Sequence, residues 1–378
     1  MAILFQATKG IRPCLDDIRN IPKSKQIIKL IKRCWNGDAE KRPKMQEIIS
    51  NINNFFPIMD VEEPNLSLKI PDKNEVNRLI EEDMNAIQKD EWKNITIEEP
   101  IKCGSFGEVY KALWKTEKGP KIIAVKRYIP FYSINSKNLT IYSLQLKHDH
   151  ILKLYCLSFD DNNRPIELME YADCGNLYSA VHDRTVNIVN NEYEKYSLMW
   201  ILHCAKGLKF LHDQNIIYGN ITTRNLLLFN NYQTLKISLS ETVRTEGTLM
   251  SEIVGNFRYM APEIVEGLQF TKKCDIYSFG IMLWEVMSRK KPFCDMISGI
   301  QLAVNVLRGH RPNINDVVNI KNSNEIKILI TNCWDADPQN RPSMEEVVGI
   351  METYSSYLEN GNQILNMMKK NITDCTFI

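Results

Sequence analysis

Two glycines and a lysine are the first residues of this sequence whose types and spacing could bind a phosphorylated ligand. Gly104 and Gly107 lie in the run KCGSFG, where backbone N–H groups can approach phosphate oxygens closely. Lys126 ends the run AVK further along the chain, and its ammonium could reach the phosphates that the turn covers. A glycine turn between two strands is also an ordinary hairpin signal, so these residues alone leave both interpretations open.

Three strand-like runs must position these residues. The runs ITIEEPI, EVYKALW and KIIAVKRY are rich in β-branched and aromatic residues and lie on either side of the glycine turn. We therefore expect strands at residues 95–101, 108–114 and 121–128, with the turn between the first two and Lys126 on the third.

An internal repeat shows how the rest of the chain is organised. Residues 1–55 align with residues 300–354 at a constant offset of 299 without a gap, and Cys34, Trp35 and Arg42 recur as Cys333, Trp334 and Arg341. Apolar residues recur at helical spacing, which predicts a pair of helices in each copy. The four stripes are Ile27, Leu30, Ile31 and Cys34; Met45, Ile48, Ile49 and Ile52; Ile326, Leu329, Ile330 and Cys333; and Met344, Val347, Val348 and Met351.

The first copy is too short to bury much core on its own, because scaffolds below roughly 70 residues seldom do so. We therefore interpret residues 1–56 as the last helices of a partial domain and residues 300–355 as the end of a complete one. Residues 57–93 read as an acidic linker with a short helix near 75–88, since residues 60–99 hold 12 acidic and 5 basic side chains. The complete domain is expected at 94–357, followed by a tail at 358–378.

Composition excludes several classes of protein. The chain has 378 residues, 44% of them hydrophobic, and a formal net charge of +1, so neither wholesale disorder nor a nucleic-acid-binding charge is indicated. No apolar run is long enough to cross a membrane. The 10 cysteines show no zinc-like spacing, which fits a reducing compartment, and we expect a cytoplasmic protein without a membrane or nucleic-acid partner.

From about Ile95 to Tyr357 the sequence resembles the protein kinases, and more closely the tyrosine-kinase-like MAP kinase kinase kinases of the TGF-β-activated kinase type. The motifs that carry this resemblance are LMEYADCGNLYSAVH, GLKFLH, YMAPE, KCDIYSFGIMLWEV and CWDADPQNRPSMEE. The resemblance implies an α+β, two-lobed fold. It predicts a small β-rich lobe with one main helix at 94–169 and a large, mostly helical lobe at 173–357. Residues 1–56 then resemble the end of the large lobe of a second, tandem kinase-like domain.

The resemblance also implies three losses in the catalytic machinery. Asn220 stands where the family has the catalytic aspartate, and an amide cannot accept a proton from a hydroxyl. Leu239 replaces the aspartate that holds magnesium, so magnesium is not expected. Leu139 occupies the position of the helix glutamate that would pair with Lys126, in a segment without any acidic residue. Lys126 is then either a phosphate clamp in a surviving pocket or an inherited lysine that reaches solvent.

The nucleotide pocket could nevertheless persist and bind ATP weakly without metal. Val109, Ala124 and Leu227 would sandwich the adenine, and the backbone at Glu170 to Ala172 would supply hydrogen bonds. The full set of candidate nucleotide-binding residues is Ile101, Gly104, Gly107, Val109, Ala124, Lys126, Met169, Glu170, Ala172, Asn225 and Leu227.

Residues that hold the fold together in the family are retained. By the resemblance, Glu263 and Arg341 form a buried ion pair, Asp275 caps the catalytic-loop backbone, and Trp284 lies on a core helix. His148 and His150 could suggest a metal pair, but without a third ligand nearby we expect a structural role.

An intact scaffold with altered catalytic residues is the pattern of a pseudokinase. We expect a protein that acts by binding, as a scaffold or allosteric regulator of an active kinase or of its substrates, rather than as an enzyme. The alternative is a weak, unconventional Ser/Thr kinase in which Glu241 holds the metal.

Overall fold

The computed structural model describes ten stretches of the chain and three single residues. These are 24–34, 91–104, 107–128, 146–162, 164–183, 190–239, 243–246, 257–296, 299–317 and 323–354, with Lys41, Pro43 and Glu47. The chain divides into two compact units, Met1–Ile70 and Pro71–Ile378. Leu139, Glu241, the expected helix near 75–88 and the tail at 358–378 lie outside the described residues, as does the expected main helix of the small lobe.

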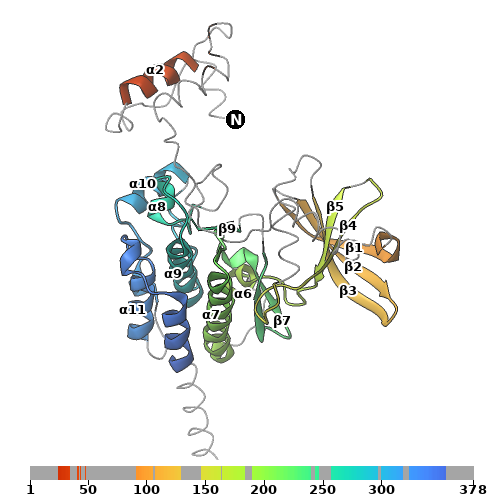
Figure 1. Cartoon of the computed structure of the whole chain (residues 1–378). Coiled ribbons are helices and arrows are strands. Elements are labelled where there is room, and N and C mark those ends of the chain that lie inside the picture. Colours follow the sequence, from red (N-terminus) through yellow and green to blue (C-terminus); the bar gives the residue numbers. More distant parts are fainter. Residues whose placement is uncertain are drawn as a thin grey trace, which may run out of the picture. The chain divides into compact units, whose positions relative to one another are not determined.

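A five-stranded antiparallel sheet forms the small lobe of the second unit, in the order β1-β2-β3-β5-β4 (Figure 1). Its strands are β1 (Ile95–Gly104), β2 (Gly107–Thr116), β3 (Gly119–Tyr128), β4 (Leu154–Phe159) and β5 (Pro165–Glu170). The three strands expected from the sequence are confirmed. One face of the sheet is closed by a core that contains Ile123, Val125, Ile166 and Leu168, since successive side chains alternate between the two faces.

The folded small lobe begins slightly before the boundary expected at residue 94. A short 3-10 helix, η3 (Glu91–Asn94), precedes β1, and Trp92 packs against the core of the sheet. The Arg127 guanidinium lies 5.4 Å from the centroid of the Trp92 ring. The last residues of the expected acidic linker therefore belong to the kinase-like unit.

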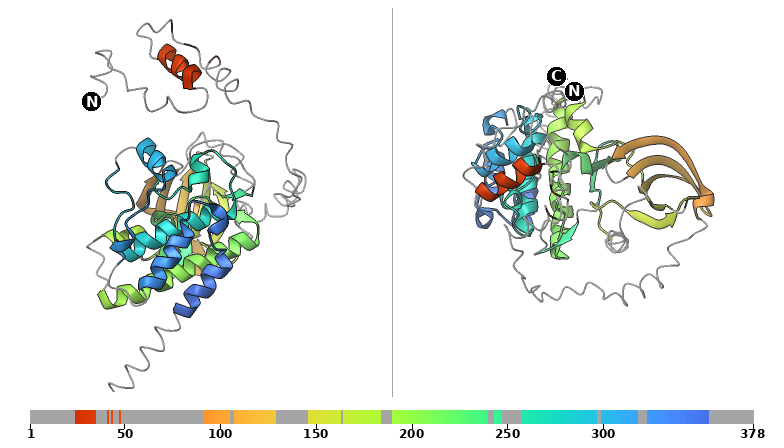
Figure 2. Two further views of the ribbon diagram at one scale, coloured as in Figure 1. Left: turned by 90° about the vertical axis from the view of Figure 1, so that its left-hand side faces the viewer. Right: turned by 90° about the horizontal axis from the view of Figure 1, so that it is seen from above.

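Helices make up most of the large lobe, on the opposite side of the unit from the sheet (Figures 1 and 2). They are α6 (Leu177–His182), α7 (Asn190–Asp213), α8 (Pro262–Val265), α9 (Lys272–Ser288), α10 (Gly299–Leu307) and α11 (Ser323–Cys333), followed by a helix at 344–354. Short strands β6 (Ile216–Ile217) and β9 (Arg244–Thr245) form one ladder, and β7 (Leu226–Phe229) and β8 (Thr234–Ile237) form another. This arrangement confirms the two-lobed α+β fold.

The core of the large lobe is built around α9, whose side chains from Cys274 to Met287 are almost all buried. The indole N–H of Trp284 donates to the carbonyl oxygen of Asn313 at 2.9 Å. Arg341 donates from both terminal nitrogens to the two carboxylate oxygens of Glu263, at 2.6 and 2.8 Å. Both groups are buried, so the expected internal ion pair and the expected core tryptophan are confirmed.

The helices of the two repeat copies correspond in position. In the first unit, α2 spans Ser24–Cys34, and in the second unit α11 spans Ser323–Cys333, which is the same segment displaced by the repeat offset. The second stripe of the later copy also forms a helix, at 344–354, with Met344, Val347 and Met351 buried. Three of the four expected helices are therefore found, and the fourth lies outside the described residues except for Glu47, which pairs with Arg33.

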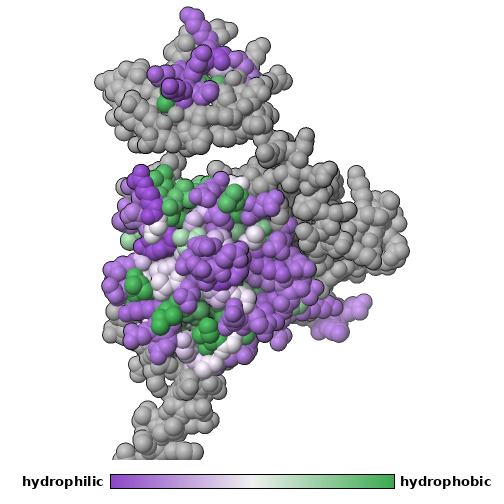
Figure 3. All heavy atoms as spheres, turned by 60° about the vertical axis from the view of Figure 1, so that its left-hand side comes forward, coloured by the Kyte–Doolittle hydropathy of each residue, from purple (hydrophilic) through white to green (hydrophobic). Residues whose placement is uncertain are grey.

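Polar side chains dominate the face of the large lobe seen in Figure 3, with separate small hydrophobic areas among them. Among the described residues of this lobe, the exposed large apolar side chains are those of Leu268, Val304, Leu307, Ile328 and Ile350. Scattered exposure of this kind is normal for a folded domain. None of the described helices has the length and apolarity that a membrane-spanning segment needs.

Candidate functional site

Side chains from both lobes meet in an apolar cluster on the inner face of the small-lobe sheet. Ala124 on β3 and Met169 on β5 are buried there together with Leu152 and Phe229. Val109, Ala172 and Leu227, which were expected in the nucleotide pocket, are partly buried and also pack against it, as does Tyr171. The small-lobe sheet forms one side of the cluster, and strand β7 of the large lobe forms the other. The structure thus brings together five of the expected nucleotide-pocket residues. Ile101 is not among them and is 50% exposed.

The glycine turn has a structural requirement of its own. Gly104 and Gly107 are paired as the last residues of β1 and the first of β2, and the two residues between them lie outside the described chain. A Cβ atom at Gly107 would lie 2.2 Å from the carbonyl oxygen of Arg127 on β3, a contact that real side chains do not make. Gly107 is therefore needed for the close approach of two strands, whether or not a phosphate binds above it.

Lys126 lies close to a carboxylate of the same sheet. Its ammonium is 4.0 Å from Oε2 of Glu167 on β5, and the two side chains are only 16% and 10% exposed. The hydroxyl of Tyr128 donates to the other carboxylate oxygen of Glu167. The sheet thus encloses most of the Lys126 side chain next to an acidic partner that the sequence analysis did not identify.

Glu170, at the end of β5, connects the two lobes. Both of its carboxylate oxygens accept from the ammonium of Lys236 on β8, at 2.9 and 2.8 Å. Oε1 also accepts the backbone N–H of Lys153 at 2.7 Å. The side chain of this candidate nucleotide-binding residue thus joins the strands, and its backbone N–H donates to the Lys153 carbonyl oxygen at 3.0 Å.

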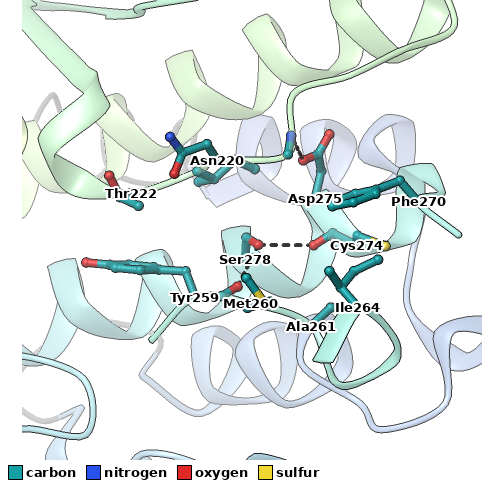
Figure 4. A pocket seen from close by; sticks show the side chains of 12 residues that line it. Asn220, Thr222, Tyr259, Met260, Ala261, Ile264, Phe270, Cys274, Asp275 and Ser278 are labelled. Carbon is teal, nitrogen blue, oxygen red and sulfur yellow. Dashed lines mark hydrogen bonds between the residues drawn. The ribbon is translucent and has the colours of Figure 1, made fainter. Parts of the chain in front are cut away.

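The loop that follows β6 corresponds to the catalytic loop expected from the sequence, and Figure 4 shows its residues beside α9. The Asp275 carboxylate accepts the backbone N–H groups of Tyr218 and Gly219, each at 2.8 Å, and contacts His212 Nε2 at 2.9 Å. Asp275 is fully buried. Its expected role as a cap of the loop backbone is confirmed, and this cap fixes the peptide on the N-terminal side of Asn220.

Asn220 follows directly, and its carbonyl oxygen accepts from the side-chain amide of Asn225 at 3.0 Å. The Asn225 carbonyl in turn accepts the backbone N–H of Ser238 at 3.0 Å. The loop residues 220 and 225 and the strand end at 238 are therefore adjacent. This is the region where a kinase assembles its base and its metal ligands.

Leu239 is the next residue after this junction, and its side chain packs against the main core of the large lobe. The Tyr218 hydroxyl donates to the carbonyl oxygen of Ser238 at 2.6 Å, which holds the chain in place just before it. Amide groups and an alkyl chain do not provide the set of anionic oxygens that magnesium prefers. In the part of the chain that the structure describes, no three His, Cys, Asp or Glu side chains are grouped as a metal site would require.

A stack of histidines packs beside strand β8 of the large lobe. The rings of His150 and His203 are 4.1 Å apart and nearly parallel, and His148 stacks on Phe210. His203 Nδ1 accepts the backbone N–H of Leu235, and the Leu235 carbonyl contacts His150. Burial lowers the pKa of His203 to about 3 and also lowers the pKa values of His148 and His150. The geometry agrees with the structural role expected for His148 and His150.

Comparison with known proteins agrees with this geometry. The family model of protein tyrosine and serine/threonine kinases matches residues 95–351. The chain is 34% identical over 268 residues to "Mitogen-activated protein kinase kinase kinase 7" of Drosophila melanogaster, an alignment that covers 69% of this chain and 37% of that protein. The human protein of the same name is 34% identical over 287 residues, 73% of this chain and 44% of its own length.

A third relative aligns with nearly the whole chain. "Dual specificity protein kinase pyk3" of Dictyostelium discoideum is 26% identical over 385 aligned residues, which cover 97% of this chain and 27% of that protein. The chain thus spans less than half the length of each of these three relatives.

Proposed function

Because the chain belongs to the protein tyrosine and serine/threonine kinase family, we propose that its MAP kinase kinase kinase-like domain is catalytically impaired and acts by binding. Its partner would be an active kinase or the substrates of that kinase, for which it serves as a scaffold or allosteric regulator. The observation that carries this proposal is the chemistry of two adjacent positions, Asn220 and Leu239.

The first argument concerns the base. Phosphoryl transfer to a hydroxyl relies on positioned charge, including a carboxylate that accepts the proton of the attacking group. Asn220 offers an amide at that position. Hydrogen bonds from the side chains of Asp275 and Asn225 hold the backbone of its loop in place. A general base contributes about 10²- to 10⁴-fold to the rate, and an amide cannot substitute for it.

The second argument concerns the metal. Leu239 packs toward the core of the large lobe rather than presenting an oxygen. By the resemblance, Asn225 matches the family's second metal ligand, and its side-chain nitrogen donates to the Asn220 carbonyl, so it offers a metal only one neutral oxygen. Magnesium dehydrates reluctantly and demands oxygen ligands in octahedral geometry, so we propose that any nucleotide binds without it.

Nucleotide binding itself is supported by the apolar cluster. Val109, Ala124, Met169 and Leu227 form an apolar cluster, and an apolar lining is typical of sites that bind a planar base. Lys126 lies on the same face of the sheet and could meet the phosphates. We therefore propose weak, metal-independent ATP binding at this cluster.

The first unit fits a tandem arrangement. Its helix α2 repeats α11 of the kinase-like domain, and the Dictyostelium kinase aligns over 97% of this chain, beyond the single domain. These observations support the proposal that residues 1–56 belong to a second kinase-like domain.

A phosphoryl-transfer assay tests the impaired activity. The full chain is incubated with radiolabelled ATP, magnesium or manganese, and a mixed library of Ser, Thr and Tyr peptides, beside the Lys126→Ala variant. We expect no incorporation above that of the variant. Incorporation that disappears in Lys126→Ala would overturn the proposal and favour the weak kinase in which Glu241, outside the described residues, holds the metal.

The binding role is tested separately. The purified chain is titrated into an active kinase of the similar MAP kinase kinase kinase group while its activity toward a peptide is measured. A saturable change in rate, at a concentration where an unrelated protein has no effect, is the expected result. No change with any kinase of that group would count against the regulatory role.

A further inference from the structure

Lys126 and Glu167 face each other directly across two neighbouring strands. The register of β3 and β5 pairs Ala124 with Met169 and Lys126 with Glu167. Residues two apart on a strand share a face, so the ion pair lies on the same face as Ala124 and Met169. The ion pair therefore lies next to Ala124 and Met169 of the apolar cluster, two residues further along each strand.

Tyr128 completes this arrangement. Its hydroxyl donates to Glu167 Oε1, while the Lys126 ammonium lies 4.0 Å from Oε2 and 4.5 Å from the centroid of the Tyr128 ring. Glu167 is 7% exposed as a residue. Both the position of the carboxylate and the path of the lysine side chain are thus restricted by groups of one sheet.

The sequence shows why such a partner is needed. Residues 127–147, which follow Lys126 in the chain, contain no aspartate or glutamate. An ammonium enclosed to this degree is unfavourable without a nearby anion. The carboxylate that a kinase normally supplies from this segment cannot come from it here, whereas Glu167 supplies one from the adjacent strand.

We propose that Glu167 is a positioning residue that replaces the missing helix carboxylate and holds Lys126 toward the phosphates of a bound nucleoside triphosphate. The β3–β5 pairing then places the carboxylate directly opposite the lysine. This inference rests on the proposed nucleotide binding, and it concerns the phosphates rather than the base.

The competing explanation is that the pair only stabilises the sheet. The two explanations differ in what they predict for different ligands. A positioning role affects ligands that carry phosphates and leaves adenosine binding unchanged, because adenosine contacts the apolar cluster alone. A purely structural role changes the stability of the protein but leaves the ratio of the two affinities as it is.

The experiment measures dissociation constants for ATP and for adenosine by calorimetry, with the full chain and with chelator present to remove divalent metal. The variants are Glu167→Gln, Glu167→Asp and Lys126→Met. The control is Glu98→Gln, which neutralises a carboxylate 3.3 Å from Lys111 in an exposed cross-strand pair of the same sheet.

We expect Glu167→Gln to weaken ATP binding about tenfold, as loss of one charge-assisted contact does, with adenosine unaffected. Glu167→Asp keeps the charge and should retain most of the affinity for ATP. Glu98→Gln should match the wild type. In the Lys126→Met background, Glu167→Gln should have no further effect on ATP, because there is no ammonium left to position.

Should Glu167→Gln fail to fold, Tyr128→Phe carries the test, since it removes one hydrogen bond to the carboxylate and keeps both charges; a two- to fivefold loss in ATP affinity alone is then expected. An unchanged ATP-to-adenosine ratio in a folded Glu167→Gln or Tyr128→Phe protein overturns the inference. The inference is also overturned if the wild-type chain binds ATP no more tightly than adenosine. Neither result bears on impaired catalysis, which the transfer assay tests separately.

Discussion

Glu170 and Lys236 form an ion pair that joins β5 of the small-lobe sheet to β8 of the large lobe. The Lys236 ammonium lies 2.9 and 2.8 Å from the two carboxylate oxygens of Glu170. The side chains are 16% and 19% exposed, so water screens the pair only in part. The position of the small lobe relative to the catalytic loop depends on contacts of this kind.

We expect the coupling energy between Glu170 and Lys236 to be about 1 to 3 kcal/mol, as for hydrogen-bonded charges with limited exposure. The measurement is a double-mutant cycle with Glu170→Gln and Lys236→Met, read by urea denaturation. Lys290 and Asp316 form the control pair, because Lys290 is 58% exposed and such pairs contribute less than about 1 kcal/mol. Equal coupling in the two pairs would contradict this expectation.

Gly107→Ala should destabilise the protein strongly. The new methyl would lie 2.2 Å from the Arg127 carbonyl, and neither strand can move without losing its ladder of hydrogen bonds. We expect a loss of about 2 to 4 kcal/mol in the free energy of unfolding. The matched control is Gly349→Ala, where a Cβ meets nothing within 4 Å and the residue lies in a helix, so a gain of up to about 1 kcal/mol is expected. Similar effects of the two changes would refute this view of Gly107.

The half-buried histidine stack predicts that stability falls in mild acid. The folded-state pKa of His203 is lowered to about 3 by burial, with His150 and Lys206 adding repulsion. An unfolded histidine titrates near 6.5, so below about pH 6.5 the unfolded state takes up a proton that the folded state excludes. Stability is therefore present above the unfolded pKa and is lost as pH falls toward 3, at up to about 1.4 kcal/mol per pH unit for this residue.

The check is the urea midpoint between pH 7 and pH 4 for the wild type and His203→Gln. The variant should show a shallower decline over this range. Met199→Leu on the same helix, α7, adds and removes no titrating group and should follow the wild type. A wild-type midpoint that does not fall, or an unchanged slope in His203→Gln, would show that the stack does not govern acid stability.

Leu239→Asp should make the binding of ATP sensitive to magnesium. The carboxylate would stand next to Ser238, whose N–H donates to the Asn225 carbonyl, so the two ligand positions of the family would be adjacent again. Thermal shift with ATP is measured with and without magnesium. The wild-type shift is expected to be the same in both conditions, and the variant shift to grow with magnesium.

Leu239→Asn is the control for this change, because it loses the same apolar packing without gaining a charge. The variants should both unfold at lower temperature than the wild type, since Leu239 packs on the core. A wild-type shift that already increases with magnesium would contradict the proposed metal-free binding.

Local patterns were enough to predict much of the fold. Alternation and β-branched residues located β1, β2 and β3, and four-residue stripes located α2, α11 and the helix at 344–354. The roles of Glu263, Arg341 and Asp275 followed from motifs that resemble a known family, and their contacts are present. The carboxylate close to Lys126 was not predicted, because the sequence reasoning considered only the segment that follows the lysine in the chain.

The identities of Asn220 and Leu239, and the lack of acidic residues after Lys126, are properties of the sequence alone, because the chemistry of an amide or an alkyl group does not depend on the fold. The partner of Lys126 is different. Glu167 faces it only because β3 and β5 pair in one register, and a shift of one residue would turn the carboxylate to the opposite face. Only the tertiary structure decides that register, since it is set by packing between segments far apart in the chain.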